Sequence, residues 1–200
     1  MAMLPRRTVL HALTLGAAWP LAGRWLAADL DALGIEIHAA LATQPVAFKT
    51  FDAAAVALVT AACDRLIPAD ETPGAVAAGV PRFIDTIMAD WETSADRDRW
   101  LRGLSSLDRD ANARHGRRFA DCAAAEQDAL LDDLDRQVSA LAGADRGSHW
   151  FARLKFLTIY GYCTSEIGLR EELRDADMPG RYDGDAPYTP RRGSTPSSRT

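Results

Sequence analysis

Apolar residues recur at the spacing of an amphipathic helix in five successive stretches of the chain. The stretches run over about residues 52–67, 81–91, 95–114, 123–142 and 148–163. Alternation with the period of a β-strand persists nowhere long enough to build a sheet. We therefore expect an all-α fold, a bundle of about five helices followed by an irregular C-terminal arm.

The apolar face of each predicted helix is expected to form the core. In the first four helices the inward residues are Phe51, Ala55, Leu58, Val59, Ala62 and Leu66; Phe83, Ile84, Ile87, Met88 and Trp91; Trp100, Leu104, Leu107 and Ala111; and Leu130, Leu131, Leu134, Val138 and Leu141. The fifth helix has the inward residues Phe151, Leu154, Thr158 and Gly161, and its face is widened by Trp150, Leu157 and Tyr160. So wide an apolar face predicts burial on more than one side, either in the centre of the bundle or against another protein.

Residues at the helix ends predict where several helices begin. Thr50 or Asp52 can cap the first helix, because a side-chain oxygen accepts a backbone N–H that has no helical partner. Pro81 suits the first turn of the second helix, where its missing N–H costs nothing. Ser148 is expected to cap the fifth helix. Ala123, at the start of the fourth, offers no such cap, which costs about 1 kcal/mol.

The remaining segments divide the chain further. Residues 29–50 carry only a weak apolar pattern interrupted by Pro45, and we expect a linker with a short helix there. Residues 51–188 form the predicted domain. The polar stretch 189–200 has the composition of a disordered tail.

The first 28 residues are typical of a targeting segment. Arg6 and Arg7 precede a mildly apolar run, the layout of a twin-arginine (Tat) export signal, whose machinery carries folded proteins. The best candidate for a cleavage site is Leu26-Ala27-Ala28. The alternative is a basic N-terminal helix that docks on the domain or on a membrane surface. We expect a periplasmic protein, and an uncleaved N-terminus would leave it associated with the membrane.

Charge argues against nucleic acid as a partner. The chain has a net charge of −5. Because the first 28 residues hold three of the 23 basic residues and none of the 28 acidic ones, the remainder has a net charge of −8. An acidic domain without a basic stripe cannot neutralise the negatively charged phosphate backbone of a nucleic acid.

Motifs for catalysis or cofactor binding are absent from the sequence. It contains no Gly-x-Gly-x-x-Gly for a dinucleotide and no Cys-x-x-Cys-His for covalent haem, and its four histidines are isolated. We therefore expect no cofactor, metal or catalytic group on this chain. Glu166 is the one carboxylate expected to be buried, which would raise its pKa and suit general acid or base catalysis. The alternative is an anchor that accepts backbone N–H groups or pairs with Arg170 or Arg181.

Three cysteines leave their oxidation state open. A disulfide between Cys63 and Cys163 requires their helices to be neighbours, and small buried apolar residues are the alternative. A bond from Cys122 or Cys163 to a partner chain is a third hypothesis. Because the number of cysteines is odd, at least one of them has no disulfide partner within the chain.

A series of spaced motifs resembles the gluconate 2-dehydrogenase subunit 3 family. The resemblance covers about residues 51–188 and rests on these segments: Ala62–Pro68, Asp70–Ala75, Ala78–Asp85, Phe119–Asp121, Glu126–Leu131, Tyr160–Tyr162, Thr164–Gly168, Glu172-Leu173 and Pro179–Gly184. Two departures from the family's pattern concern cysteine. Cys163 stands where relatives usually have an aromatic residue, and Asp185 where many have a cysteine, which places any shared cysteine role in doubt.

The resemblance implies a small, non-catalytic subunit of a periplasmic flavin-dependent dehydrogenase. Its large partner would be an FAD-binding flavoprotein of the glucose–methanol–choline (GMC) type that oxidises a sugar, sugar acid or glycoside. Electrons would leave through a cytochrome c subunit carrying haem c. The small subunit would supply the Tat signal, so that the flavoprotein travels as a folded passenger. The alternative is a stand-alone helical periplasmic protein that binds a small ligand or acts as a chaperone.

Under the leading hypothesis, residues 154–188 form the docking element. The fifth helix seats a Thr-Ser-Glu turn in the bundle, and the Pro-Gly-Arg-Tyr-Asp-Gly arm reaches onto the partner, since Tyr and Arg suit interface contacts. The predicted contact residues are Tyr160, Tyr162, Cys163, Thr164, Ser165, Glu166, Pro179, Gly180, Arg181, Tyr182, Asp183 and Gly184.

Overall fold

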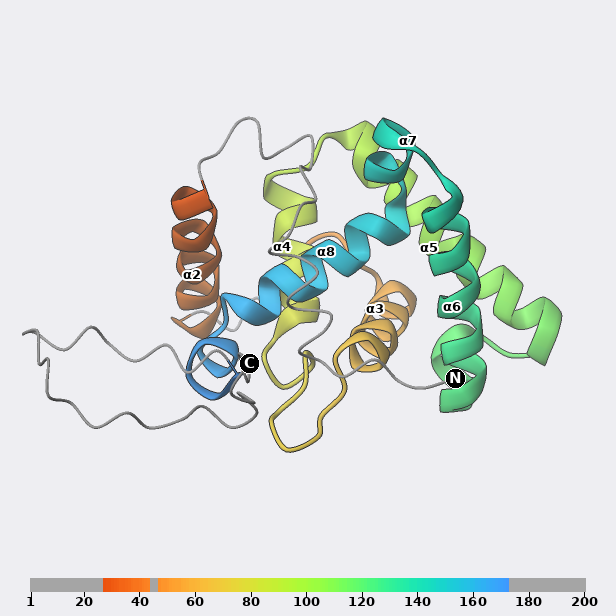
Figure 1. The fold of residues 1–200 in the computed structure, drawn as a ribbon, viewed down its shortest axis with the longest axis horizontal. Coiled ribbons are helices and arrows are strands. Elements are labelled where there is room, and N and C mark those ends of the chain that lie inside the picture. Colours follow the sequence, from red (N-terminus) through yellow and green to blue (C-terminus); the bar gives the residue numbers. More distant parts are fainter. Residues whose placement is uncertain (1–26, 44–46, 173–200) are drawn as a thin grey trace, which may run out of the picture.

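A computed structural model describes residues 27–43 and 47–172, and these residues form an all-α fold without strands, which confirms the predicted class (Figure 1). Within these described residues, six helices have seven or more residues: α2 (Ala27–Thr43), α3 (Ala53–Leu66), α4 (Val80–Asp90), α5 (Ser94–His115), α6 (Ala124–Ala140) and α8 (Trp150–Cys163). Shorter pieces complete the described part: the 3₁₀ turn η1 (Phe119–Asp121), α7 (Gly143–Ser148) and the π-helical turn η2 (Gly168–Glu172).

Helix α2 corrects the prediction of a linker with a short helix over residues 29–50. It has 17 residues and starts inside the segment expected to be the export signal. Ile37 is buried, and Leu33 and Leu41, four residues to either side, pack against the core. The apolar pattern of α2 is weak along the sequence. The helix forms nevertheless, since packing on the rest of the domain, rather than intrinsic propensity, stabilises most helices in proteins.

The predicted helix starts are largely confirmed. Asp52 caps α3 by accepting the N–H of Ala55 at 2.8 Å, and Pro81 lies in the first turn of α4. Ala123 has no capping side chain, but Glu126 reaches back and accepts the N–H of Ala123 at 2.8 Å.

The cap predicted at Ser148 is wrong by one residue. Ser148 ends α7, and the cap of α8 is His149, whose Nδ1 accepts the N–H of Phe151 at 3.2 Å. A histidine ring nitrogen can substitute for a hydroxyl here because the interaction requires only an acceptor near the first free N–H groups.

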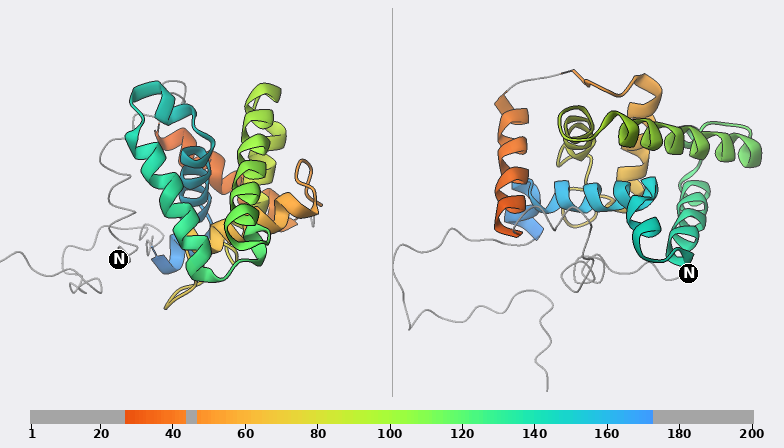
Figure 2. Two further views of the ribbon diagram at one scale, coloured as in Figure 1. Left: turned by 90° about the vertical axis from the view of Figure 1, so that its right-hand side faces the viewer. Right: turned by 90° about the horizontal axis from the view of Figure 1, so that it is seen from above.

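Helix α8 is the central element, as its wide apolar face predicts. It crosses the domain between α2 on one side and α6 with α7 on the other, and its end meets α2 (Figures 1 and 2). It packs against α3, α4, α5, α6 and α7. At one crossing α5 comes so close that a Cβ on Gly103 would lie 2.2 Å from Cγ of Trp150.

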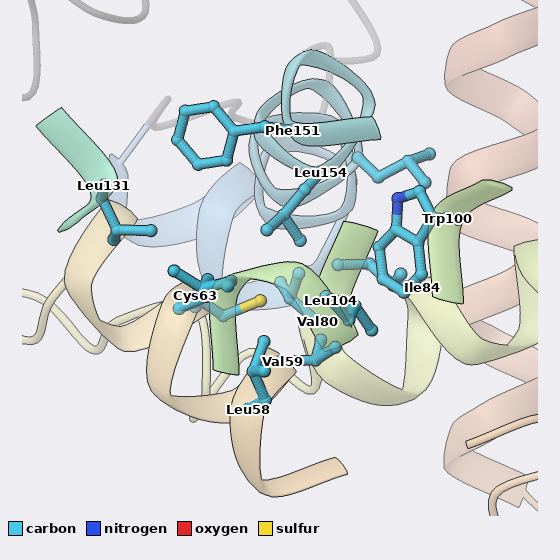
Figure 3. Packing of buried hydrophobic residues seen from close by; sticks show 14 of the residues in the cluster. Leu58, Val59, Cys63, Val80, Ile84, Trp100, Leu104, Leu131, Phe151 and Leu154 are labelled. Carbon is cyan, nitrogen blue, oxygen red and sulfur yellow. The ribbon is translucent and has the colours of Figure 1, made fainter. Parts of the chain in front are cut away.

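The core lies where these helices face one another (Figure 3). The inward residues predicted for α5, Trp100, Leu104, Leu107 and Ala111, are all buried, and so are those predicted for α8. Among the inward residues predicted for the other helices, Ala55, Leu66 and Leu141 are half-buried, and Trp91 departs most, because 51% of it is exposed. Since α4 ends at Asp90, Trp91 no longer follows the helical period that would direct it inward.

A buried carboxylate that sequence analysis missed fixes the segment between α2 and α3. Asp85 of α4 is 2% exposed. It accepts the backbone N–H groups of Lys49 at 2.6 Å and of Thr50 and Phe51 at 2.9 Å each. Three N–H bonds satisfy a buried carboxylate that would otherwise be costly. Asp85 therefore holds the chain onto α4 just before α3 begins.

Candidate partner-contact surface

The C-terminal end of α8 is closed by a compact turn, Thr164 to Gly168. Thr164 Oγ1 donates to the carbonyl of Tyr160 at 2.8 Å. Ser165 Oγ donates to the carbonyl of Tyr162 at 2.7 Å and accepts the N–H of Gly168 at 3.0 Å. These bonds satisfy carbonyls that the helix end would leave free. Gly168 is required, since a Cβ there would lie 1.9 Å from the Tyr162 carbonyl oxygen.

The predicted contact residues in this turn differ in accessibility. Tyr162, Thr164 and Ser165 are buried, and the Tyr162 hydroxyl donates to the carbonyl of Pro73 at 3.1 Å. Tyr162 thus links the end of α8 to the loop before α4, whereas Thr164 and Ser165 bond within the turn itself. Tyr160 and Cys163 are half-buried, so they are partly accessible from outside.

Glu166 is not the buried carboxylate that the sequence suggested. Its side chain is 74% exposed, and it pairs with Arg170 at 2.9 Å. The anchoring alternative is thus confirmed in part, through Arg170. An exposed pair of this kind contributes at most about 1 kcal/mol.

The other predicted site residues lie outside the described part of the chain. These are the export residues Arg6 and Arg7 and the arm residues Pro179, Gly180, Arg181, Tyr182, Asp183 and Gly184. Their roles stay predictions.

Next to the turn, α2 is seated on α8 and α4. His38 Nε2 lies 2.7 Å from the carbonyl oxygen of Gly161 and donates to it. The His38 ring stacks on Phe83 of α4 with centroids 4.8 Å apart. Burial lowers the pKa of His38, so its ring is neutral at pH 7.

Glycine at position 34 allows α2 to approach the turn closely. A Cβ on Gly34 would lie 2.5 Å from Thr164 Oγ1. In the sequence His38 is isolated from other histidines, and Gly34 belongs to no recognisable motif. The signal that was available is their spacing of four residues, which places both on one face of a helix.

Tyr160 of α8 lies beside the residues on which α2 packs, and it is half-buried. Its ring stacks on Phe156 at 5.8 Å, and the guanidinium of Arg153 lies 5.6 Å from the Phe156 ring centroid. Burial and, to a lesser extent, the negative charge of Asp31 raise the pKa of Tyr160 to about 12. The phenol is therefore protonated at neutral pH, and it is hydrogen-bonded to the backbone of Gly34 in α2.

The disulfide between Cys63 and Cys163, one of the alternatives left open, does not form in this structure, since none of the three cysteines is in a disulfide. The residue of α8 that faces Cys63 is Thr158, with Sγ 3.6 Å from Thr158 Oγ1, and Cys163 lies more than a helical turn further along. Burial raises the pKa of the Cys63 thiol to about 12. Cys63 and Cys122 are small buried residues, as the alternative proposed. A bond between chains through Cys122 or Cys163 stays a prediction.

Groups of acidic, histidine and cysteine side chains that could hold a metal ion do not occur within residues 27–43 and 47–172. A shallow hollow lies along the C-terminal half of α5, lined by Ser105, Asp108, Arg109, Asn112, Ala113 and Arg118. Its carboxylate is already engaged, because Asp108 accepts the N–H of Phe119 at 2.8 Å. In the part of the chain that the structure describes, no helix has the length and apolar character needed to cross a bilayer.

Comparison with known proteins gives one match. The family model described as gluconate 2-dehydrogenase subunit 3 matches residues 53–180, from the first residue of α3 to beyond η2. Neither the curated proteins nor the solved structures contain a match.

Proposed function

The chain belongs to the gluconate 2-dehydrogenase subunit 3 family, the small subunit of such dehydrogenase complexes, and from this premise we propose that it is the non-catalytic escort of a flavoprotein. Its main partner is a large, FAD-binding subunit of the GMC type that oxidises a sugar, sugar acid or glycoside. Electrons pass on to a cytochrome c subunit carrying haem c. The small chain binds neither cofactor itself.

The family match over residues 53–180 carries this proposal. The structure supports a binding role for the end of α8 over a catalytic one. Ser165 and Thr164 are the hydroxyl groups nearest to the carboxylate of Glu166 in the sequence, and both are engaged with backbone carbonyls. Glu166 itself is exposed beside Arg170. Catalysis needs positioned groups that act together, whereas these groups hold a turn in place.

The contact with the flavoprotein is proposed at the outer surface of the α8 end, where Tyr160, Cys163 and Glu166 are at least partly accessible. The arm of residues 179–184 continues this contact. Tyrosine and arginine are enriched among the residues that contribute most to interfaces, which supports Tyr160, Arg181 and Tyr182 as contacts.

We further propose that the chain carries the complex to the periplasm by the Tat route, with Arg6 and Arg7 as the recognised pair. Exchanging both residues for lysine is expected to leave most of this chain and of a co-expressed flavoprotein in the cytoplasm. The measurement is the amount of each protein, and the dehydrogenase activity, in periplasmic and cytoplasmic fractions.

The choice of lysine makes the experiment discriminating. Lysine keeps the positive charge, so a basic helix that merely docks on a surface would act as before. Arg24→Lys, beyond the apolar run, is the matched control and should be exported normally. Normal export of the Arg6→Lys, Arg7→Lys protein would contradict the proposal, and a chain exported without any effect on the flavoprotein would favour the stand-alone binding protein or chaperone.

A further inference from the structure

Helix α2 lies outside the segment that matches the family, yet it packs into the same core. The match begins at residue 53, and α2 ends at Thr43. Ile37 is only 7% exposed, and Leu33 and Leu41 pack against the buried cluster. In sequence, α2 begins at Ala27 and so overlaps the last two residues of the predicted export segment, residues 1–28.

The seat of α2 is composite, because it is formed by residues from two helices that are far apart in sequence. Phe83 comes from α4, and Gly161 and Thr164 come from the end of α8. The ring of Phe83 contacts both sides: it stacks on His38, and a Cβ on Gly161 would lie 2.7 Å from Cδ1 of Phe83. The Gly161 carbonyl also accepts the His38 hydrogen bond. The seat therefore exists only after α4 and α8 have packed together.

The link after α2 depends on α4 as well. The N–H groups of Lys49, Thr50 and Phe51 all bind the carboxylate of Asp85. Both α2 and the segment that follows it are thus held by the folded bundle. A detached α2 has little to stabilise it, since most of the stability of a helix in a protein comes from packing of its apolar face. Detachment of α2 would expose Leu33, Ile37 and Leu41, which follow the predicted signal closely in sequence. It would also uncover the face of Phe83 on which His38 stacks.

We propose that α2 is a latch that closes only on the folded domain and thereby couples folding to export. This inference rests on the proposed Tat export. With the latch closed, the chain next to the export signal is helical and its apolar side is covered. With the latch open, the signal is followed by an unfolded apolar segment. A machinery that carries folded proteins would then accept the first state and reject the second.

The test compares two substitutions in α2 of the full-length chain. Gly34→Leu places a side chain where even a Cβ would lie 2.5 Å from Thr164 Oγ1 and 2.6 Å from its Cγ2. Ala39→Leu adds a leucine on the exposed side of the same helix and is the control. Leucine is a better helix former than glycine, so loss of α2 in Gly34→Leu cannot arise from helix propensity.

Hydrogen–deuterium exchange of the purified protein and the exported fraction in cells are the two readouts. In Gly34→Leu, residues 31–43 are expected to lose protection while α3 to α8 keep theirs, and the exported fraction should fall several-fold. In Ala39→Leu both readouts should match the wild type. His38→Ala, which removes the hydrogen bond and the stacked ring without adding bulk, should shift both in the same direction as Gly34→Leu.

Each of the following outcomes would contradict the proposal that α2 is a latch. Protection of α2 that survives Gly34→Leu and His38→Ala would show that the seat is not what holds it. Loss of protection throughout α4 and α8 would show that α2 is an inseparable part of the core. An open α2 with normal export would break the coupling while leaving the proposed export intact. Normal export of the Arg6→Lys, Arg7→Lys protein would instead reject the proposed export route, whatever α2 does.

Discussion

Replacing Asp85 with alanine is expected to lower the free energy of unfolding by about 3–5 kcal/mol, since each unsatisfied N–H in a largely buried setting costs roughly 1–3 kcal/mol. The carboxylate is 2% exposed and accepts three successive backbone N–H groups. Alanine would leave all three without their acceptor. Urea unfolding followed by circular dichroism at pH 7 measures the change.

Asp90→Ala is the matched control for this experiment. Asp90 lies in the same helix and also interacts with Lys49, but through an exposed ion pair in which the side chains are 41% and 46% exposed. Exposed pairs contribute at most about 1 kcal/mol, so this variant should be nearly as stable as the wild type. Equal effects of the two substitutions would show that Asp85 does not hold the segment before α3.

Replacing Phe83 with alanine is expected to destabilise the domain by about 3–5 kcal/mol, the usual cost of truncating a fully buried phenylalanine. Phe83 is 0% exposed. Its ring contacts two other helices, because it stacks on His38 of α2, packs against Gly161 of α8 and makes an edge contact with Tyr160 of α8 at 5.5 Å. The cavity would therefore lie at the junction of α2, α4 and α8. Thermal and urea unfolding of the variant measure the loss.

Trp91→Ala supplies the control for Phe83. It truncates a larger aromatic residue at the end of the same helix, but 51% of Trp91 is exposed. Surface substitutions usually change stability by less than about 1 kcal/mol. A loss for Trp91→Ala as large as that for Phe83→Ala would contradict the assignment of the core and favour the inward position that helical periodicity predicts for Trp91.

Helical periodicity predicted most of the fold correctly because the pattern is a local property. The inward residues of α5 follow a simple repeat, and Asp52 and Pro81 mark helix starts through interactions within one turn. The central position of α8 was predicted from the width of its apolar face. These features require knowledge only of neighbouring residues.

The features that were missed depend on contacts between distant parts of the chain. Helix α2 has many apolar residues, but their spacing gives only a weak helical pattern, and its burial depends on α4 and α8. Asp85 interrupts the buried apolar face of α4, and its partners lie 34 to 36 residues earlier. The interruption was visible in the sequence, but the three N–H groups that satisfy it were not.

In the candidate site, too, the local features were predictable and the orientations of the side chains were not. The residues predicted at the end of α8 form a connected turn, since Thr164 and Ser165 both close it, and their contact with a partner stays a prediction. The direction of each side chain was not predictable. Glu166 is exposed while its neighbour Ser165 is buried, and this contrast arises from the geometry of the turn rather than from the residue types.

The central claim, that this chain is the small subunit of a flavoprotein dehydrogenase, is tested most directly by purifying the tagged full-length protein from the cells that encode it. We expect it to elute from size exclusion together with a large subunit, in a fixed ratio, with the absorbance spectrum of bound flavin and with dehydrogenase activity. A variant lacking residues 179–188 should keep its helical circular dichroism but lose most of the flavoprotein. Elution of the intact chain as a lone monomer, with no flavin in its peak, would contradict the account.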